Sequence, residues 1–360
     1  MLDQILNEIR KEGPIPFERF MELALYGEKG FFASEILRSE KNADFVTSPE
    51  VSPLFGGTLA ELVGRVRSEV GEPFRLVEVG AGSGSLLNAL LPIAPVEAWA
   101  VEASSAARSR LEKTIPADHV TASLGSVPGP FKGLILANEL IDNLPMAVAR
   151  RTDSGWIELW VGVESGRLVR VEMPPRSEVQ AWLAEYAGPV EPGGMVEVQL
   201  AASSWLSVAL EKLEDGAVVL FDYGDTAEGL RSRRTDGTIR TYRAHHLGPD
   251  PLLEPGETDI TADVNFSALA ATARKAGFFT EYCRQDDFLI DLGLGEESER
   301  MASAKRRFEE EGSWDMARDI GERLAAAQTL IHPRGLGDFR VLVARSFVQP
   351  ISESGLALSL

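Results

Sequence analysis

Short apolar runs alternate with helical segments in the middle of the chain, and this pattern predicts the fold class. Strand-like runs occupy residues 74–79, 96–101, 119–122 and 133–137, the third of them weakly apolar. The first two runs are followed by stretches whose apolar residues recur at helical spacing. Strands that alternate with helices in this way are typical of an α/β protein with a parallel, doubly wound sheet.

The pattern changes on both sides of this region. Residues 1–70 have apolar positions at helical spacing and predict helices. Two β-rich runs, 156–163 and 167–173, flank a polar turn and predict an inserted hairpin. The run 217–221 resumes the sheet, and we expect a long loop at about 225–261. The remaining expected elements are a helix at 266–276, strands at 278–283 and 339–343, and a pair of amphipathic helices at 298–330.

Composition and charge argue against several classes of protein function. The chain has 360 residues, of which 44% are hydrophobic, and it carries 36 basic against 55 acidic side chains, a formal net charge of −19. This is the composition of a globular protein, and its acidity argues against a nucleic-acid partner, which would need a basic face. Because there are one Cys and four scattered His, we expect neither a disulfide scaffold nor a metal site.

The sequence also bears on location. No apolar run approaches the ~18 residues that a membrane helix needs, so we expect no membrane insertion. Residues 1–13 have neither secretory nor transit character. We therefore expect a cytoplasmic protein whose net charge serves mainly solubility.

The most informative local feature is the sequence E-V-G-A-G-S-G at residues 78–84, between a predicted strand and a predicted helix. Glycines at such a turn let the backbone approach a ligand closely, and the helix start adds free N–H groups. Glu102 ends the next strand, 22 residues after Gly80, where a carboxylate accepts hydrogen bonds from ribose hydroxyls. Together these features predict a nucleotide-type ligand; a tight turn without a ligand is the alternative.

The spacing of the glycines favours one cofactor over another. In a dinucleotide-binding fold the third glycine follows the second by three residues, whereas Gly84 follows Gly82 by two. This E-x-G-x-G-x-G form looks like the motif of class I methyltransferases that use S-adenosylmethionine (SAM). Glu78 supports that cofactor, because a carboxylate there suits the cationic amino end of SAM and would serve a pyrophosphate poorly. An NAD-dependent oxidoreductase is an alternative that rests on the sheet alone.

Further segments occur in the order found in one methyltransferase family. They are residues 13–17 (GPIPF), 44–56 (DFVTSPEVSPLFG), 137–145 (ANELIDNLP), 222–224 (DYG), 237–242 (GTIRTY) and 259–266 (DITADVNF), together with the glycine loop. Because they run through nearly the whole chain, the sequence resembles the MidA-like family, which includes the mitochondrial arginine methyltransferase used in respiratory complex I assembly. The chain departs from the family pattern at Leu140, where relatives often have Phe, and at Ser83, where they often have Arg.

The resemblance implies a Rossmann-like, seven-stranded, doubly wound methyltransferase sheet with an N-terminal helical cover and an inserted β-hairpin and helical region. It implies SAM as the cofactor and a protein substrate, methylated on arginine in the mitochondrial relatives. The parts that we expect are an N-terminal cover or lid (1–70), a SAM-binding half (71–145), the insertion (146–215), the rest of the sheet with a substrate loop and C-terminal helices (216–348), and a tail (349–360). The alternative function is a SAM-binding assembly factor with little turnover, and the chain could form a homodimer.

The candidate cofactor residues come from the motif and from the resemblance. Around the predicted crevice they are Glu78, Gly80, Ala81, Gly82, Gly84, Glu102, Ala103 and Asn138. The resemblance adds Phe20, Thr47, Pro49 and Glu50, in segments that would fold over SAM as a lid. For the second of these segments the alternative is a helix start, with Ser48 as the cap and Pro49 in the first turn.

Carboxylates after the fourth strand are the candidate catalytic groups. In an open α/β sheet the ligand crevice lies outside the carboxyl ends of the strands, so Asn138, Glu139 and Asp142 should face it. A guanidinium pairs well with carboxylates, and it must lose a proton when it is methylated. We expect Glu139 to be the first candidate for these roles and Asp142 the second. The alternatives are a solvated strand end for Glu139 and a turn or helix cap for Asp142.

Candidates for substrate binding lie further along the chain. Asp222 and Tyr223 end another predicted core strand, and Tyr242 and His245 lie in the long loop. Because a long loop in a compact domain is often functional, we expect these residues to line a groove for a substrate peptide.

Overall fold

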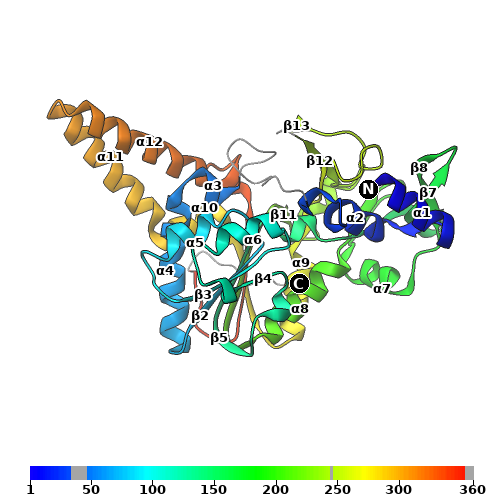
Figure 1. The fold of residues 1–360 in the computed structure, drawn as a ribbon, viewed down its shortest axis with the longest axis horizontal. Coiled ribbons are helices and arrows are strands. Elements are labelled where there is room, and N and C mark those ends of the chain that lie inside the picture. The colour runs from blue at the N-terminus through cyan, green and yellow to red at the C-terminus, as the bar shows by residue number, and fades with distance from the viewer. Residues whose placement is uncertain (34–46, 244–245, 353–360) are drawn as a thin grey trace.

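A seven-stranded sheet forms the centre of the molecule, as the sequence predicted (Figure 1). The computed structural model describes residues 1–33, 47–243 and 246–352. The strand order is β16-β17-β10-β5-β2-β3-β4, and only β17 runs antiparallel to its neighbours. The strands are β2 (Arg75–Val79), β3 (Glu97–Val101), β4 (Val120–Thr121), β5 (Phe131–Asn138), β10 (Leu213–Asp222), β16 (Phe279–Arg284) and β17 (Arg340–Arg345).

Helices cover both faces of this sheet, because successive residues of a strand point to opposite sides. Leu76 of β2 packs into the core on one face, and Val77 packs into the core on the other. The first face is covered by α4 (Pro53–Val70), α5 (Ser85–Leu90), α10 (Gln285–Leu289) and α12 (Trp314–Leu330), with α3 (Ser48–Val51) and α6 (Ser105–Leu111) at its upper edge. The second face is covered by α8 (Leu200–Glu211) and α9 (Phe266–Lys275), which confirms the doubly wound prediction.

A second, smaller sheet carries the N-terminal helices. Its strands are β1 (Ile15–Pro16), β6 (Ala147–Thr152), β7 (Gly155–Glu164), β8 (Arg167–Met173) and β9 (Met195–Val198). β1 pairs with β7, and α1 (Leu2–Glu12) and α2 (Phe17–Tyr26) share one apolar core with β6 and β7. On the opposite face α7 (Ser177–Tyr186) packs against β6 and β9. Residues 1–33 of the expected N-terminal cover therefore share a core with strands of the expected insertion, whereas α4, at the end of that expected cover, packs on the central sheet.

The described residues between 225 and 261 form more secondary structure than the expected loop. They contain β12 (Arg240–Arg243), β13 (His246–Leu247) and β14 (Asp259–Thr261), which form a three-stranded sheet of their own. β11 (Gly224–Asp225) also pairs with β15 (Val264–Asn265). Strands of two to four residues have too few positions to show a period of two, so the sequence pattern did not reveal them.

Two long helices project from the body of the molecule. α11 (Gly295–Glu310) and α12 form an antiparallel pair, as the sequence predicted, and Figure 1 shows the pair extending away from the sheet. Across the described residues, no helix combines the length and the apolar character that crossing a membrane requires.

Candidate functional site

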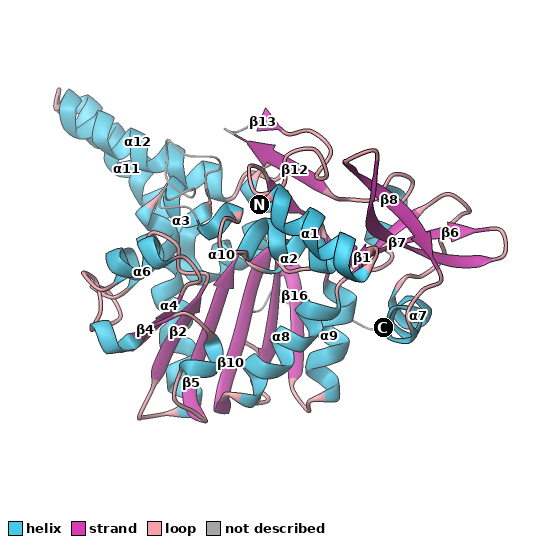
Figure 2. Ribbon diagram, turned by 45° about the vertical axis from the view of Figure 1, so that its right-hand side comes forward, coloured by secondary structure: helices cyan, strands magenta, loops and turns pink. Residues whose placement is uncertain are grey.

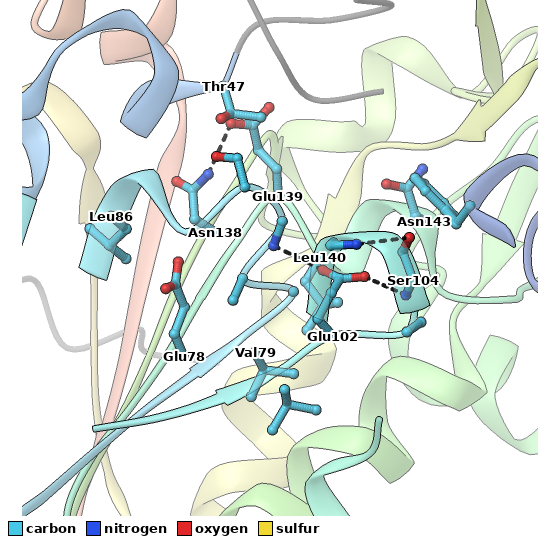
Figure 3. A pocket seen from close by; sticks show the side chains of 18 of the residues that line it. Thr47, Glu78, Val79, Leu86, Glu102, Ser104, Asn138, Glu139, Leu140 and Asn143 are labelled. Carbon is cyan, nitrogen blue, oxygen red and sulfur yellow. Dashed lines mark hydrogen bonds between the residues drawn. The ribbon is translucent and has the colours of Figure 1, made fainter. Parts of the chain in front are cut away.

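A cavity of about 350 Å³ lies at the carboxyl ends of β2, β3 and β5 (Figure 3). The glycine loop follows β2, Glu102 follows β3, and Asn138 and Glu139 stand at the end of β5. This is the place where an open α/β sheet binds its ligand. The cofactor candidates that line the cavity are Glu78, Gly80, Ala81, Gly82, Glu102, Ala103, Asn138, Thr47, Pro49 and Glu50.

The glycine loop turns sharply between β2 and α5. Gly82 has a φ of +51° and Gly84 a φ of +82°, a region of backbone conformation that favours glycine. Gly84, which the sequence predicted to bind the cofactor, does not line the cavity and stands at the N-cap of α5. A Cβ atom on Gly84 would lie 2.9 Å from Leu111 Cδ2, so this glycine serves the close packing of α5 against the neighbouring core.

Glu102 connects the two loops that bound the cavity. Its Oε2 accepts a hydrogen bond from the Gly82 N–H at 2.9 Å, and its Oε1 accepts one from the Ser104 N–H at 2.8 Å. Each carboxylate oxygen has a second lone pair, so Glu102 can still accept hydrogen bonds from a ligand in the cavity. A pair of ribose hydroxyls is suited to that arrangement.

Glu78 and Asn138 offer acceptors that have no partner. Glu78 is 5% exposed, and neither its Oε2 nor Asn138 Oδ1 accepts a hydrogen bond within the described part of the chain. Figure 3 shows the Glu78 side chain pointing toward Asn138 from the neighbouring strand. Burial, and secondly the charge of Glu102, raises the pKa of Glu78 well above its usual range. A cationic amino group bound between the two side chains would satisfy both acceptors.

This geometry makes binding of an ammonium-bearing ligand depend on pH. Because the ammonium group needs the ionised form of Glu78, ligand binding releases a proton and weakens as pH falls. We expect the Kd of S-adenosylhomocysteine to rise as the pH is lowered from 8 to 6 in isothermal titration calorimetry. Glu78→Gln should bind more weakly at pH 8 and lose most of this dependence, whereas Glu139→Gln should keep it. Equal pH dependence in wild type and Glu78→Gln would refute the assignment.

Glu139 is an acidic side chain that lines the cavity directly after the end of β5. It is held in place because its Oε1 accepts hydrogen bonds from Asn138 Nδ2 at 3.0 Å and from the Ser48 N–H at 3.3 Å. Its backbone has a φ of +51°, an unusual value for a residue other than glycine and one that clusters at functional sites. Desolvation, and secondly the charge of Asp142, raises the pKa of Glu139 to about 8. The side chain can therefore change protonation state near neutral pH.

The segment that precedes α4 closes over the glycine loop. Glu50 accepts hydrogen bonds from the hydroxyls of Ser83 and Ser85, the second at 2.8 Å. Thr47 and Pro49 line the cavity beside it. The serines were missed in the sequence, although they lie within and just after the motif, because their partner Glu50 is distant along the chain.

The aromatic part of the cavity wall differs from the prediction. Phe20 is fully buried in the core of the second sheet, with its ring 5.5 Å from that of Phe17, and it does not line the cavity. Tyr26, six residues later on α2, and Phe32 line it instead. The Tyr26 hydroxyl donates a hydrogen bond to the Asn143 carbonyl at 3.2 Å, which holds the end of α2 at the crevice. The resemblance to family segments identified the helix but not the position that reaches the ligand.

Asp222 supports the crevice from below and does not contact its contents. It is fully buried, and it accepts hydrogen bonds from the N–H groups of Ile141, Asp142 and Tyr223 at 2.9, 3.2 and 2.9 Å. The Tyr223 hydroxyl donates to Asp142 Oδ2, which also accepts from Thr261 Oγ1 at 2.8 Å. Neither Asp222 nor Tyr223 lines the cavity, because both side chains are engaged in this hydrogen-bonded layer, and their expected substrate contacts stay a prediction.

Asp142 belongs to the same layer. It is 3% exposed and does not line the cavity, so the expected direct catalytic role does not fit its position. Its charge contributes to the raised pKa of Glu139, which makes it a positioning residue. Of the remaining substrate candidates, Tyr242 is half-buried on β12 and does not line the cavity, and His245 lies outside the described residues.

The buried contacts of Asp222 predict a large effect on stability. Asp222→Ala would leave three N–H groups, two of them in buried hydrogen bonds, without an acceptor, so we expect it to lower the free energy of unfolding by about 3 kcal/mol in urea denaturation. Asp222→Asn keeps one carbonyl oxygen and should lose less. An effect below about 1 kcal/mol for the alanine variant would contradict the supporting role.

In the described part of the chain, no group of three or more His, Cys, Asp and Glu side chains could hold a metal ion. The ligand-binding features are instead the positive-φ glycine turn, the Glu102 carboxylate and the unpartnered Glu78 and Asn138 acceptors. Together with the order of the seven strands, they define a SAM-dependent methyltransferase.

Comparison with known proteins gives the family. Residues 56–282 match a family described as "putative S-adenosyl-L-methionine-dependent methyltransferase", and the chain belongs to this family. It is similar to the mitochondrial protein arginine methyltransferase NDUFAF7 of Xenopus tropicalis, with 28% identity over 82% of this chain and 75% of that protein. The Drosophila melanogaster homologue is 29% identical over 76% of this chain and 70% of that protein.

A solved structure is similar over the whole chain. A Burkholderia thailandensis protein, crystallised with bound S-adenosylhomocysteine, superposes with a TM-score of 0.87 at 28% sequence identity and covers 100% of this chain and 96% of that chain. The cofactor of this family is SAM, and the residues of this cavity fit it. Glu102 suits the ribose hydroxyls, and the unpartnered oxygens of Glu78 and Asn138 suit the amino group.

Proposed function

We propose that the chain transfers the methyl group of SAM to the guanidinium of an arginine in a protein substrate. The observation that carries this proposal is Glu139, a half-buried carboxylate that lines the cofactor cavity and forms no ion pair with any described residue. A planar guanidinium is the side chain that pairs best with such a carboxylate. The names of the related mitochondrial proteins, which are protein arginine methyltransferases, support the same acceptor.

Glu139 would act in two ways during the reaction. SAM, when bound, supplies a methyl group on a sulfonium, so that the S–C bond breaks as a C–N bond forms. Glu139 would first orient the guanidinium by accepting hydrogen bonds from its N–H groups. It would then accept the proton that the methylated nitrogen loses, directly or through water. Tyr26 and Phe32 would limit the access of water, since both line the cavity with aromatic rings 5.5 Å apart.

This role predicts how the rate depends on pH. The pKa of Glu139 is raised to about 8, and only the ionised form pairs with the guanidinium and accepts its proton. We therefore expect kcat/KM for the protein substrate to rise with pH, to be half-maximal near pH 8 and to level off above about pH 9, at a fixed, saturating SAM concentration. The residual activity of Glu139→Gln should lack this rise. A wild-type profile that is flat between pH 6 and pH 9 would contradict the role.

The proposal is tested with labelled cofactor and natural partners. The chain, purified with the proteins that bind it, is incubated with SAM that carries a radioactive methyl group, and the proteins are separated. We expect the label in at least one partner protein and its absence when Glu139→Gln replaces the wild type. If no protein is labelled although the chain binds both SAM and its partners, a SAM-binding assembly factor with little turnover is the better account. The cytoplasmic location and the homodimer stay predictions.

A further inference from the structure

A second cavity, of about 370 Å³, lies between the second sheet and β12, away from the cofactor cavity. Its walls combine apolar residues, such as Phe17 and Leu159, with charged residues, such as Asp236 and Asp250. Glu197 on β9 also lines it, although this side chain is only 8% exposed. A buried carboxylate is costly unless a partner satisfies it, so its surroundings indicate what the cavity can bind.

Glu197 is fixed in place but only partly satisfied. Its Oε1 accepts a hydrogen bond from the Thr238 N–H at 2.7 Å, and a Cβ atom on Gly237 would lie 2.6 Å from the same oxygen. The loop thus closes tightly on one side of the carboxylate. No hydrogen bond to Oε2 and no ion pair of Glu197 is found among residues 1–33, 47–243 and 246–352.

The basic residues in and near the cavity form no ion pair with Glu197 within the described part of the chain. Arg170, which lines the rim, pairs with Asp250 at 2.6 Å, and Arg240 pairs with Asp263 at 3.0 Å. The charge of buried Arg234 acts on Glu197 from beyond ion-pair distance. Among the described residues none of these cations pairs with Glu197, so its carboxylate, which lines the cavity, can accept another cation.

We propose that this cavity binds a lysine or arginine side chain of the substrate protein, at a position other than the methylated arginine. The aliphatic stem of such a side chain would pack against the apolar residues of the walls, and its charged end would reach Glu197. The inference rests on the proposed function for the identity of the partner, but the binding of a basic side chain here does not require methyl transfer.

Helix α2 spans the distance between the two cavities, and this sets the spacing between the target arginine and the second basic residue of the substrate. Phe17 at its start lines the second cavity, and Tyr26 at its end lines the cofactor cavity. Nine residues of an α-helix rise about 13 Å, which an extended peptide covers in about four residues. Figure 2 shows α2 next to the upper ends of the central strands, on the side of the second sheet. We therefore expect the second basic residue about four positions from the target arginine.

The test measures peptide binding with the chain loaded with S-adenosylhomocysteine, so that no turnover is needed. Fluorescence anisotropy compares two labelled peptides of glycine and serine that contain one arginine and, four residues away, either lysine or glutamine. We expect the wild type to bind the lysine peptide about tenfold more tightly. Glu197→Gln should bind both peptides equally, and Glu139→Gln should keep the tenfold preference. Glu211→Gln, an exposed change at the end of α8, is the matched control and should also keep it.

A second variant keeps the result interpretable if Glu197→Gln is unstable. Met195→Lys would place an ammonium group of the chain itself on the cavity wall, and it should likewise abolish the preference. A preference that survives in both variants, or equal binding of the two peptides by the wild type, would overturn the proposal. Failure of the proposed function would give a different result. No arginine would then be methylated, even though the wild type still bound the lysine peptide more tightly.

Discussion

Glu139→Gln is expected to lower kcat for protein methylation by about 10²- to 10⁴-fold, the usual contribution of a positioned general base. The glutamine side chain is nearly the same size and can still accept the hydrogen bond from the Ser48 N–H, so the cavity should keep its shape. It can neither pair with a guanidinium as an anion nor accept its proton. The measurement is single-turnover methylation at saturating SAM, with the substrate protein found by labelling.

Two controls separate this loss from damage to the cofactor site. The Kd of S-adenosylhomocysteine for Glu139→Gln should stay within about threefold of the wild-type value at pH 8. Glu61→Gln, on the exposed side of α4, should methylate at the wild-type rate. Wild-type activity in Glu139→Gln would show that another group accepts the proton and would remove the catalytic assignment.

Glu102→Ala is expected to weaken the binding of SAM and S-adenosylhomocysteine by about 100-fold. The change removes the acceptor for two ribose hydroxyls, and hydrogen bonds to a charged group contribute about 1.5 kcal/mol or more each. It also frees the N–H groups of Gly82 and Ser104, which Glu102 holds at 2.9 and 2.8 Å, so the loop loses its fixed geometry. Isothermal titration calorimetry measures the effect directly.

The matched control for this variant is Glu112→Ala, an exposed carboxylate just after α6. It should bind both ligands as the wild type does. A change of less than threefold in Glu102→Ala would place the ribose elsewhere and would require a different orientation of the cofactor.

The sequence predicted the parts of the site that local patterns encode. A strand, a glycine turn and a helix are neighbours in the chain, so the positions of Glu78, Gly82 and Glu102 followed from their place at strand ends. Asn138 and Glu139 were found for the same reason, because the end of β5 lies beside the end of β2. The same rule also selected Asp222, whose burial depends on the segment that folds over it and is invisible in the local pattern.

Features that depend on contacts between distant segments could not be predicted from local sequence patterns. Tyr26 and Phe32 reach the cavity only because α2 is held against the second sheet and against Asn143. Glu50 is fixed by Ser83 and Ser85, which lie more than thirty positions later in the chain. Glu197 lies on a short strand within the insertion, and its burial depends on the distant loop around Thr238, which closes on it. No local pattern therefore indicated a binding site at Glu197.

The central claim, arginine methylation by this chain, is tested most directly by tandem mass spectrometry of the substrate protein after incubation with SAM that carries a trideuterated methyl group. The account predicts fragment ions that place the deuterated methyl group on an arginine guanidinium in the wild-type reaction, with at least a 100-fold lower signal for Glu139→Gln. A deuterated methyl group found only on lysine, on a carboxylate or on a small molecule would contradict it.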